Sequence, residues 1–273
     1  MPNTSKETEM PQCVQTSVMV SAVDNLKLIL SQPDESVDLI YCDILYGTGR
    51  NFGDYQDLKP IRSEIESHYL PRLIEMKRVL KQNGSIYLQM DTRINHWMRI
   101  LMDDVFGYGN FRNEIVWCYS TASTPKIKQF PRNHDVILWY SKSDKWVFNK
   151  DSIREPFKNG KPNGGNKWLK ENETLEEWRI KQAEMGKIPF DWITDIYKIG
   201  TSIENVKYAT QKPKELISRF VLASTNEGDV VADYYLGSGT TAVVCKELNR
   251  NFIGCDINPK AIEITNARLD ALL

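Results

Sequence analysis

The feature that most constrains the fold lies near the end of the chain. An apolar run over Val230 to Asp233 precedes two glycines, Gly237 and Gly239, then a helical pattern and a second apolar run that ends at Asp256. This order predicts a strand, a turn, a helix and a strand, with a carboxylate at the tip of the second strand. Seventeen residues follow Asp256, too few for the other strands of an α/β sheet, so those strands must come from earlier in the chain.

The glycine-containing turn has the features of a nucleotide-type cofactor site. Glycines let the backbone approach a ligand, the following helix offers unpaired N–H groups, and an acid placed like Asp256 can accept hydrogen bonds from a ribose diol. The alternative is an ordinary strand-to-helix turn with a solvated acid, and the complete order of elements favours the cofactor site. NAD is disfavoured because Ala242 and Val243 stand where a dinucleotide fingerprint has its third glycine.

Composition excludes several classes of protein. The chain has 273 residues, 41% hydrophobic and 26% charged, which is typical of one large globular domain or one domain with an insert. No run resembles a membrane span or a secretory signal, so we expect a cytoplasmic protein without a membrane partner. Five dispersed cysteines and three isolated histidines show no metal-ligand spacing, so we expect reduced, mostly buried thiols and no metal.

Charge is unevenly distributed although the net charge is −1. Between Arg112 and Lys187, Lys and Arg outnumber Asp and Glu by 15 to 10, and Trp, Tyr and Phe residues are interleaved with them. Basic and aromatic residues together suit a nucleic-acid face, for phosphates and for base stacking respectively. A solvated face above an aromatic core fits the same pattern, and the composition alone leaves both interpretations open.

The first half of the chain predicts alternating strands and helices. Val37–Cys42 is an apolar run typical of a buried parallel strand, and it ends at Asp43. The glycine-containing loop after it lies where open α/β sheets carry their chemistry. Other predicted elements are strands at Ser17–Val23 and Ser85–Met90, a helical turn at Asp24–Leu30, helices at Ile61–Leu80 and Ile94–Val105, and a turn at Asn83–Gly84.

The second half departs from this alternation. Strands are predicted at Glu114–Tyr119, Val136–Tyr140 and Trp146–Phe148 as an antiparallel extension of the sheet. A loop is predicted at Phe157–Gly165, and helices at Thr174–Met185 and Lys214–Thr225.

Four motifs in a fixed order make the chain resemble a known family, the permuted β class of DNA amino-methyltransferases. These are Asp43-Ile44-Leu45-Tyr46, Asn133 to Lys142, Tyr208 to Pro213, and Asp233 to Thr241 with Asp256. In that family a catalytic Asp-Pro-Pro-Tyr motif precedes the cofactor motif, and a target-recognition region lies between them. The resemblance spans roughly Val18 to Leu269.

The resemblance implies a Rossmann-like, doubly wound, mostly parallel sheet of the class I methyltransferase type, circularly permuted, with an inserted target-recognition region. It implies four segments: a flexible N-terminus (1–16), the catalytic half of the core (17–119), the insert, which partly continues the sheet (120–207), and the cofactor half (208–273).

The same resemblance implies S-adenosylmethionine as the cofactor. Tyr208 and Ala209 depart from the His-Pro that is usual in the family before the stretch that reaches the methionine end. The residues implied to bind the cofactor are Asp24, Thr210, Lys212, Asp233, Tyr235, Gly237, Ser238, Gly239, Thr240 and Asp256.

The chemistry expected of the first motif follows from the exocyclic amine of a base. Its lone pair is delocalised into the ring, so the nitrogen becomes nucleophilic only when acceptors draw its N–H groups toward tetrahedral geometry. The carboxylate of Asp43 and the backbone carbonyl of Ile44 are the expected acceptors. The target nucleotide must leave the duplex, and Tyr46 is the expected stacking platform for the flipped base. In the family an Asp at the first motif position goes with adenine, so adenine in DNA is the expected substrate.

Ile44 and Leu45 stand where the family has two prolines, which fix φ and hold the loop carbonyls in place. Because both functional side chains remain, we expect activity. The alternatives are a catalytically weakened DNA-binding or regulatory subunit, or an amino-methyltransferase acting on cytosine or RNA.

Double-stranded DNA is the expected partner, and relatives suggest a homodimer and a cognate restriction endonuclease within a restriction-modification system. Action at the bacterial nucleoid would follow. The predicted phosphate contacts are Arg50, Lys126, Lys128 and Arg132, with a solvated surface charge as the alternative for each.

Overall fold

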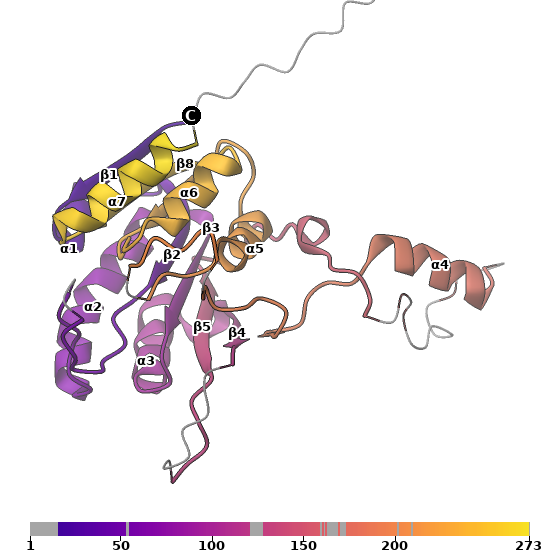
Figure 1. Ribbon diagram of the computed structural model, residues 1–273, viewed down its shortest axis with the longest axis horizontal. Helices are drawn as coiled ribbons and strands as arrows, with labels where there is room; N and C mark the ends of the chain where they lie inside the picture. The colour runs from indigo at the N-terminus through magenta and orange to yellow at the C-terminus, as the bar shows by residue number, and fades with distance from the viewer. Residues whose placement is uncertain are drawn as a thin grey trace, which may run out of the picture.

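One sheet organises the molecule in the computed structural model (Figure 1). The structure describes residues 16–52, 55–120, 128–158, 160, 162, 169, 173–200, 202–208 and 210–272. Within these residues, 8 strands are hydrogen-bonded in the order β1-β8-β7-β2-β3-β5-β4-β6. Neighbours that are distant in sequence show that the two ends of the chain share one sheet.

Five of the strands form its parallel part. They are β1 (Val18–Ala22), β8 (Asn251–Asp256), β7 (Val230–Asp233), β2 (Val37–Asp43) and β3 (Leu80–Met90). Leu39 of β2 pairs with Val231 of β7, and β1 pairs with β8 along its whole length. The strands that complete the sheet around the C-terminal unit therefore come from the beginning of the chain, as the sequence requires.

Helices cover both faces of this sheet. On one face lie α1 (Asn25–Ser31), α2 (Arg62–Val79) and α3 (Asn95–Phe106), and on the other α5 (Lys214–Ser224), α6 (Thr240–Glu247) and α7 (Pro259–Asp270). The alternation along β2 accounts for two cores, because successive side chains of a strand point to opposite faces. Ile40 and Cys42 pack with the first set of helices, Leu39 and Tyr41 with the second. The predicted doubly wound, mostly parallel α/β fold is confirmed.

The remaining strands extend the sheet beyond β3. Strand β5 (His134–Ser141) runs antiparallel to β3, β4 (Phe111–Cys118) runs antiparallel to β5, and the short β6 (Trp192–Ile193) is parallel to β4. The predicted antiparallel extension is therefore present. Two 3₁₀ turns are also present, η1 (Tyr108–Asn110) before β4 and η2 (Lys150–Ile153) after β5. Helix α4 (Leu175–Met185) stands apart from the sheet and has no buried residue (Figure 1).

Two local predictions are wrong. Asn83–Gly84 was predicted as a turn but lies within β3, where a Cβ at Gly84 would meet the Asp38 carbonyl at 2.9 Å, so glycine serves close strand packing. Trp146–Phe148 was predicted as a strand and is irregular. Its apolar residues cover other side chains, with the Trp146 ring 3.8 Å from the Arg112 guanidinium and the Phe148 ring 5.4 Å from that of Trp139.

Helix α7, which the sequence pattern did not predict, closes the C-terminal unit. Asn258 caps its first turn by accepting a hydrogen bond from the Lys260 N–H (3.1 Å), and Pro259 occupies the position where a missing N–H costs nothing. Residues 1–15, predicted to be flexible, lie outside the described residues, as does part of the predicted loop 157–165. Among the described helices, none combines the length and apolar character that a membrane crossing demands.

Candidate active site

The pairing of β7 with β2 places the ends of both strands at one edge of the sheet, the usual position for ligands in an open α/β fold. A cavity of about 420 Å³ lies between the loops that follow these strands. That volume is within the range of small-molecule sites. The predicted catalytic and cofactor-binding residues line it, apart from Gly239: Asp24, Asp43, Ile44, Tyr46, Thr210, Lys212, Asp233, Tyr235, Gly237, Ser238, Thr240 and Asp256.

The two glycines of the turn have different structural reasons to be glycine. Both have left-handed backbones, with φ +51° at Gly237 and +73° at Gly239. Gly237 faces the cavity, whereas a Cβ at Gly239 would lie 2.2 Å from the hydroxyl oxygen of Thr265 in α7. Gly239 therefore lets α7 pack closely against the turn, a role different from the close approach to a ligand expected from the sequence.

The carboxylate of Asp256 fixes the conformation of this turn at the tip of β8. One oxygen accepts a hydrogen bond from the Gly237 N–H and the other from the Asn258 N–H, both at 2.9 Å. Burial raises the pKa of Asp256, and these backbone hydrogen bonds oppose that effect. Each oxygen retains a lone pair, so the group can still accept a hydrogen bond from a hydroxyl in the cavity.

Asp233 is the last residue of β7, and its carboxylate is hydrogen-bonded to the turn. Its oxygens accept hydrogen bonds from the Thr241 hydroxyl (2.6 Å) and the Tyr235 N–H (3.0 Å). Only 2% of the side chain is exposed, and this burial raises its pKa to about 7. Asp233 connects the strand, the turn and the first turn of α6.

A second wall of the cavity comes from α1 and α2. Asp24 accepts a hydrogen bond from the Lys27 N–H (3.2 Å) as the cap of α1 and pairs with Arg72 of α2 at 3.1 Å. The Tyr235 hydroxyl lies 3.1 Å from Nε2 of His68. Burial, and then the charge of Arg72, lower the pKa of His68 to about 4, so this imidazole is neutral near pH 7.

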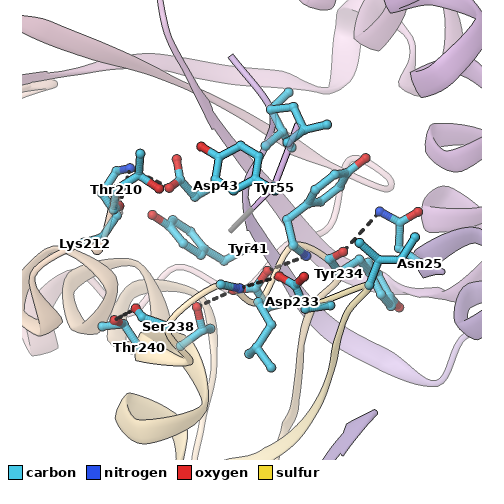
Figure 2. Close-up of a pocket in the computed structure, with 18 of the residues that line it drawn as sticks. Asn25, Tyr41, Asp43, Tyr55, Thr210, Lys212, Asp233, Tyr234, Ser238 and Thr240 are labelled. Atoms are coloured by element: carbon cyan, nitrogen blue, oxygen red, sulfur yellow. Dashed lines mark hydrogen bonds and ion pairs between the residues drawn. The ribbon is translucent and has the colours of Figure 1, made fainter. Parts of the chain in front are cut away.

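Asp43, at the end of β2, carries two short contacts. One oxygen accepts a hydrogen bond from the Lys212 ammonium (2.5 Å) and the other from the Tyr46 hydroxyl (2.8 Å); Figure 2 shows Asp43 beside Thr210 and Lys212. The ammonium also donates to the Thr210 carbonyl (3.2 Å). Burial raises the pKa of Asp43, while the positive charge of Lys212 acts to lower it.

Hydrogen bonds hold the loop after β2, in which Ile44 and Leu45 replace the two prolines of the resembled motif. The Ile44 N–H, a group that proline does not have, donates to the Gln89 carbonyl (3.1 Å) and continues the pairing of β2 with β3. The Tyr69 hydroxyl donates to the Leu45 carbonyl (3.0 Å). Further along, the Gly47 and Thr48 N–H groups donate to Asp57 at 3.1 and 2.7 Å. The loop therefore has external anchors where proline would supply internal stiffness.

Sequence reasoning missed several side chains at this site. Tyr41 and Tyr55 line the cavity, and burial raises the pKa of Tyr55 to about 12. Tyr41 could have been found, because it precedes Asp43 by two positions and so shares its face of the strand. Asp135 contacts Tyr46 across the sheet at 2.7 Å, and no local pattern connects residues so far apart in the chain.

Three of the predicted phosphate contacts, Arg50, Lys128 and Arg132, are exposed and do not line the cavity. The fourth, Lys126, is outside the described residues. Because β5 is antiparallel to β3, with Val136 opposite Met90, the segment that leads into β5 is at the same edge of the sheet as the loop after β2.

Metal ligands do not gather anywhere in the described part of the chain, where no group of three His, Cys, Asp or Glu side chains could hold an ion. Of the cysteines that the structure describes, Cys42, Cys118, Cys245 and Cys255 are free thiols. Three of these four are buried, as their apolar sequence context indicates.

Comparison with known proteins shows the family of the chain. The N6_N4_Mtase family, described as DNA methylase, matches residues 37–267. The chain belongs to this family. The Type II methyltransferase M.HpaI of Haemophilus parainfluenzae is 32% identical over 264 residues, which cover 96% of the chain and 75% of the relative. The DNA adenine methyltransferase YhdJ of Escherichia coli K12 is 30% identical over 262 residues, covering 94% and 83%.

Solved structures share the fold of this DNA methylase. The M1.HpyAVI–SAM complex superimposes with a TM-score of 0.61 at 20% identity, covering 93% of this chain and 99% of the other. The cytosine-N4-specific PvuII DNA methyltransferase superimposes with a TM-score of 0.66 at 16% identity, covering 93% and 87%. At these identities the likeness concerns the fold, which is the class I methyltransferase arrangement.

Proposed function

We propose that this DNA methylase transfers a methyl group from S-adenosylmethionine to the exocyclic amine of adenine at a specific sequence in double-stranded DNA. The observation that carries the proposal is the shared cavity: Asp43 and the Gly237 turn come from opposite ends of the chain and line one space of about 420 Å³. A carboxylate acceptor and a nucleotide-type site side by side are what amine methylation needs.

The residues present fit the cofactor. Asp256 offers acceptor capacity at the tip of β8, suited to a ribose diol, and Asp24 stands on the opposite wall. Gly237, Ser238 and Thr240 bring the turn against the cavity, and Tyr41 and Tyr235 supply apolar ring surface. When bound, S-adenosylmethionine supplies an electrophilic methyl group on a positively charged sulfur.

The chain's own residues would prepare the nucleophile. Asp43 and the Ile44 carbonyl accept the two N–H groups of the base amine, which localises the nitrogen lone pair. The nitrogen would form a bond to the methyl carbon as the carbon–sulfur bond breaks with its electron pair left on sulfur, and the nitrogen would then pass one proton to water. Tyr46 stacks on the flipped base, and the loop anchors at Gln89 and Tyr69 keep the Ile44 carbonyl in place.

Adenine is the proposed base because Asp43 stands at the first position of the motif and because YhdJ is named as an adenine methyltransferase. The exposed Arg50, Lys128 and Arg132, at the edge of the sheet that carries the site, are proposed phosphate contacts. The name of M.HpaI supports a place in a restriction-modification system, with action in the cytoplasm on nucleoid DNA. A homodimer and a cognate endonuclease belong to this proposal, testable by light scattering and by co-purification.

The test is transfer of labelled methyl groups to duplex DNA, followed by digestion to nucleosides and mass spectrometry. The wild-type chain should yield N6-methyladenine. Asp43→Asn, which keeps the shape of the side chain and removes its charge, should bind S-adenosylmethionine with unchanged affinity and transfer no methyl group. N4-methylcytosine as the product would overturn the proposed base, and binding without any turnover would indicate the regulatory subunit instead.

A further inference from the structure

A second buried carboxylate lies beside the proposed catalytic loop. Asp135 is in β5, is 2% exposed, and accepts three hydrogen bonds: from the hydroxyl of Tyr46 (2.7 Å), the side-chain amide of Gln89 (2.8 Å) and the hydroxyl of Tyr119 (2.7 Å). Buried carboxylates are costly unless fully hydrogen-bonded, and this one is surrounded by donors from three other segments of the chain.

The hydroxyl of Tyr46 connects the two carboxylates. Its oxygen lies 2.8 Å from Asp43 and 2.7 Å from Asp135, yet a hydroxyl has one proton and can donate to only one acceptor at a time. When the proton points to Asp135, the facing oxygen of Asp43 meets a lone pair and needs another donor. An exocyclic N–H of the base is such a donor.

The ammonium of Lys212 also lies near both carboxylates, those of Asp43 and Asp135. It is 2.5 Å from the other oxygen of Asp43 and 4.0 Å from Asp135, and only 7% of this residue is exposed. A base amine that donates to Asp43 competes with this ammonium. Because a buried charge needs a partner, Lys212 can leave Asp43 at low cost only if a second carboxylate receives it. Asp135 is close enough to receive the ammonium after a movement of the Lys212 side chain alone.

We propose, resting on the proposed function, that Asp135 is a positioning residue for methyl transfer: it accepts the Tyr46 hydroxyl proton when a base N–H takes that place on Asp43, and it receives the Lys212 ammonium when the base N–H takes the other oxygen. The pairs Asp43–Lys212 and Asp135–Lys212 are then the two states of one switch. Tyr46 keeps its ring orientation in both states because one carboxylate always accepts its proton.

The charges around Asp43 agree with this arrangement. Burial raises its pKa, Lys212 lowers it, and the negative charge of Asp135 raises it again. The titratable and charged groups that face the pair are Tyr41 on β2, Tyr46 and Tyr55 on the loop after β2, Tyr119 after β4, Lys198 after β6, Lys212 before α5, and Asp233 at the end of β7. Removing the charge of Asp135 should therefore make Asp43 easier to ionise.

The experiment compares wild type with Asp135→Asn in steady-state methyl transfer, S-adenosylmethionine binding and thermal unfolding. We expect kcat to fall by about 10-fold to 100-fold, the cofactor Kd to stay within twofold, and the acid limb of kcat/KM to move to lower pH. Asp38→Asn is the matched control, because Asp38 is also buried and paired with a lysine (2.8 Å) but lies at the other end of β2. It should lower Tm without changing kcat.

Wild-type kcat in Asp135→Asn would overturn the inference. So would a fall in cofactor affinity by the same factor as the fall in kcat, accompanied by a lower Tm. If this variant does not fold, Tyr46→Phe is the second test. It removes the hydroxyl shared by the two carboxylates and keeps the ring, so kcat should fall about tenfold, and an unchanged kcat contradicts the role of Asp135. A wild-type chain without methyl transfer would refute the proposed function instead, so the two failures are distinguishable.

Discussion

The ammonium of Lys212 lies 2.5 Å from a carboxylate oxygen of Asp43, although the two residues are 169 positions apart in the chain. Asp43 ends β2, and Lys212 precedes α5, the helix that leads into β7. The pairing of β2 with β7 brings them together. This ion pair acts to lower the pKa of a carboxyl that burial raises, so it favours the ionised form of Asp43.

Removal of that ammonium should change the pH dependence of the reaction. In Lys212→Met the pKa of Asp43 rises further, because the largest of the effects that oppose burial is lost. Since the proposed acceptor must be ionised, the acid limb of kcat/KM, which reports the free enzyme, should move to higher pH. The measurement is methyl transfer at a subsaturating DNA concentration across the pH range in which the protein stays folded.

Lys214→Met is the control for this shift. Lys214 is two residues away and pairs with Glu247 at 2.6 Å, on a part of the surface outside the cavity. Its removal should leave both limbs of the pH profile in place. An acid limb that stays fixed in Lys212→Met would show that Asp43 does not govern the reaction.

Tyr69→Phe tests how the loop after β2 is held without prolines. It removes the hydroxyl that donates to the Leu45 carbonyl (3.0 Å). We expect a loss of about 1 kcal/mol in the free energy of unfolding and a fall in kcat of about tenfold, because the neighbouring Ile44 carbonyl is a proposed acceptor and loses its fixed position. Urea denaturation and methyl transfer measure the two effects.

The comparison for this variant is Tyr87→Phe. Tyr87 is equally buried, and its hydroxyl lies 2.8 Å from that of Ser224, away from the loop. The two variants should lose similar stability, whereas only Tyr69→Phe should lose activity. Equal kcat values in both would mean that the loop needs no anchor at Leu45.

Much of this fold could be predicted from the sequence because its signals are local. The apolar run Val37–Cys42 ends at an acid, as does Val230–Asp233, and parallel strands place their carboxyl ends at one edge. That rule alone brings Asp43 and the Gly237 turn to the same part of the molecule. The order of the motifs then identified the family, which the match over residues 37–267 confirms.

Other features depend on contacts that no local pattern encodes. Trp146–Phe148 has the composition of a strand, but its residues are apolar because they cover Arg112 and Trp139. Asp135 lies in the motif Asn133 to Lys142, which carried no role for it, and only the pairing of β5 with β3 places it against Tyr46. Helix α7 was not predicted either, although the close packing of Thr265 in that helix is what requires a glycine at position 239.

Gly239→Ala should destabilise the protein more than its backbone angle alone predicts. The left-handed φ of +73° costs about 1–2 kcal/mol for alanine, and the new Cβ would lie 2.2 Å from the Thr265 hydroxyl oxygen, which adds about 1–3 kcal/mol of overpacking. Gly228→Ala measures the first part alone, because its φ is +83° and nothing lies within 4 Å of the added atom. Similar free energies of unfolding for the two variants would rule out close packing between α7 and the turn.

Asp233 should make stability depend on pH in a direction unusual for a carboxylate. Its pKa is about 7 in the folded protein and 3.8 ordinarily, so between these values the folded state holds a proton that the unfolded state has lost. Rising pH therefore favours unfolding, by at most about 1.4 kcal/mol per pH unit, and the effect levels off above pH 7.

Asp233→Asn keeps the contacts of the side chain with Tyr235 and Thr241 and removes its titration. The free energy of unfolding of wild type minus that of the variant, from urea denaturation of the cofactor-free protein, should thus fall steadily from pH 5 to pH 7. A difference that stays constant, or that grows with pH, would show that this carboxyl is already ionised at the lower end of the range.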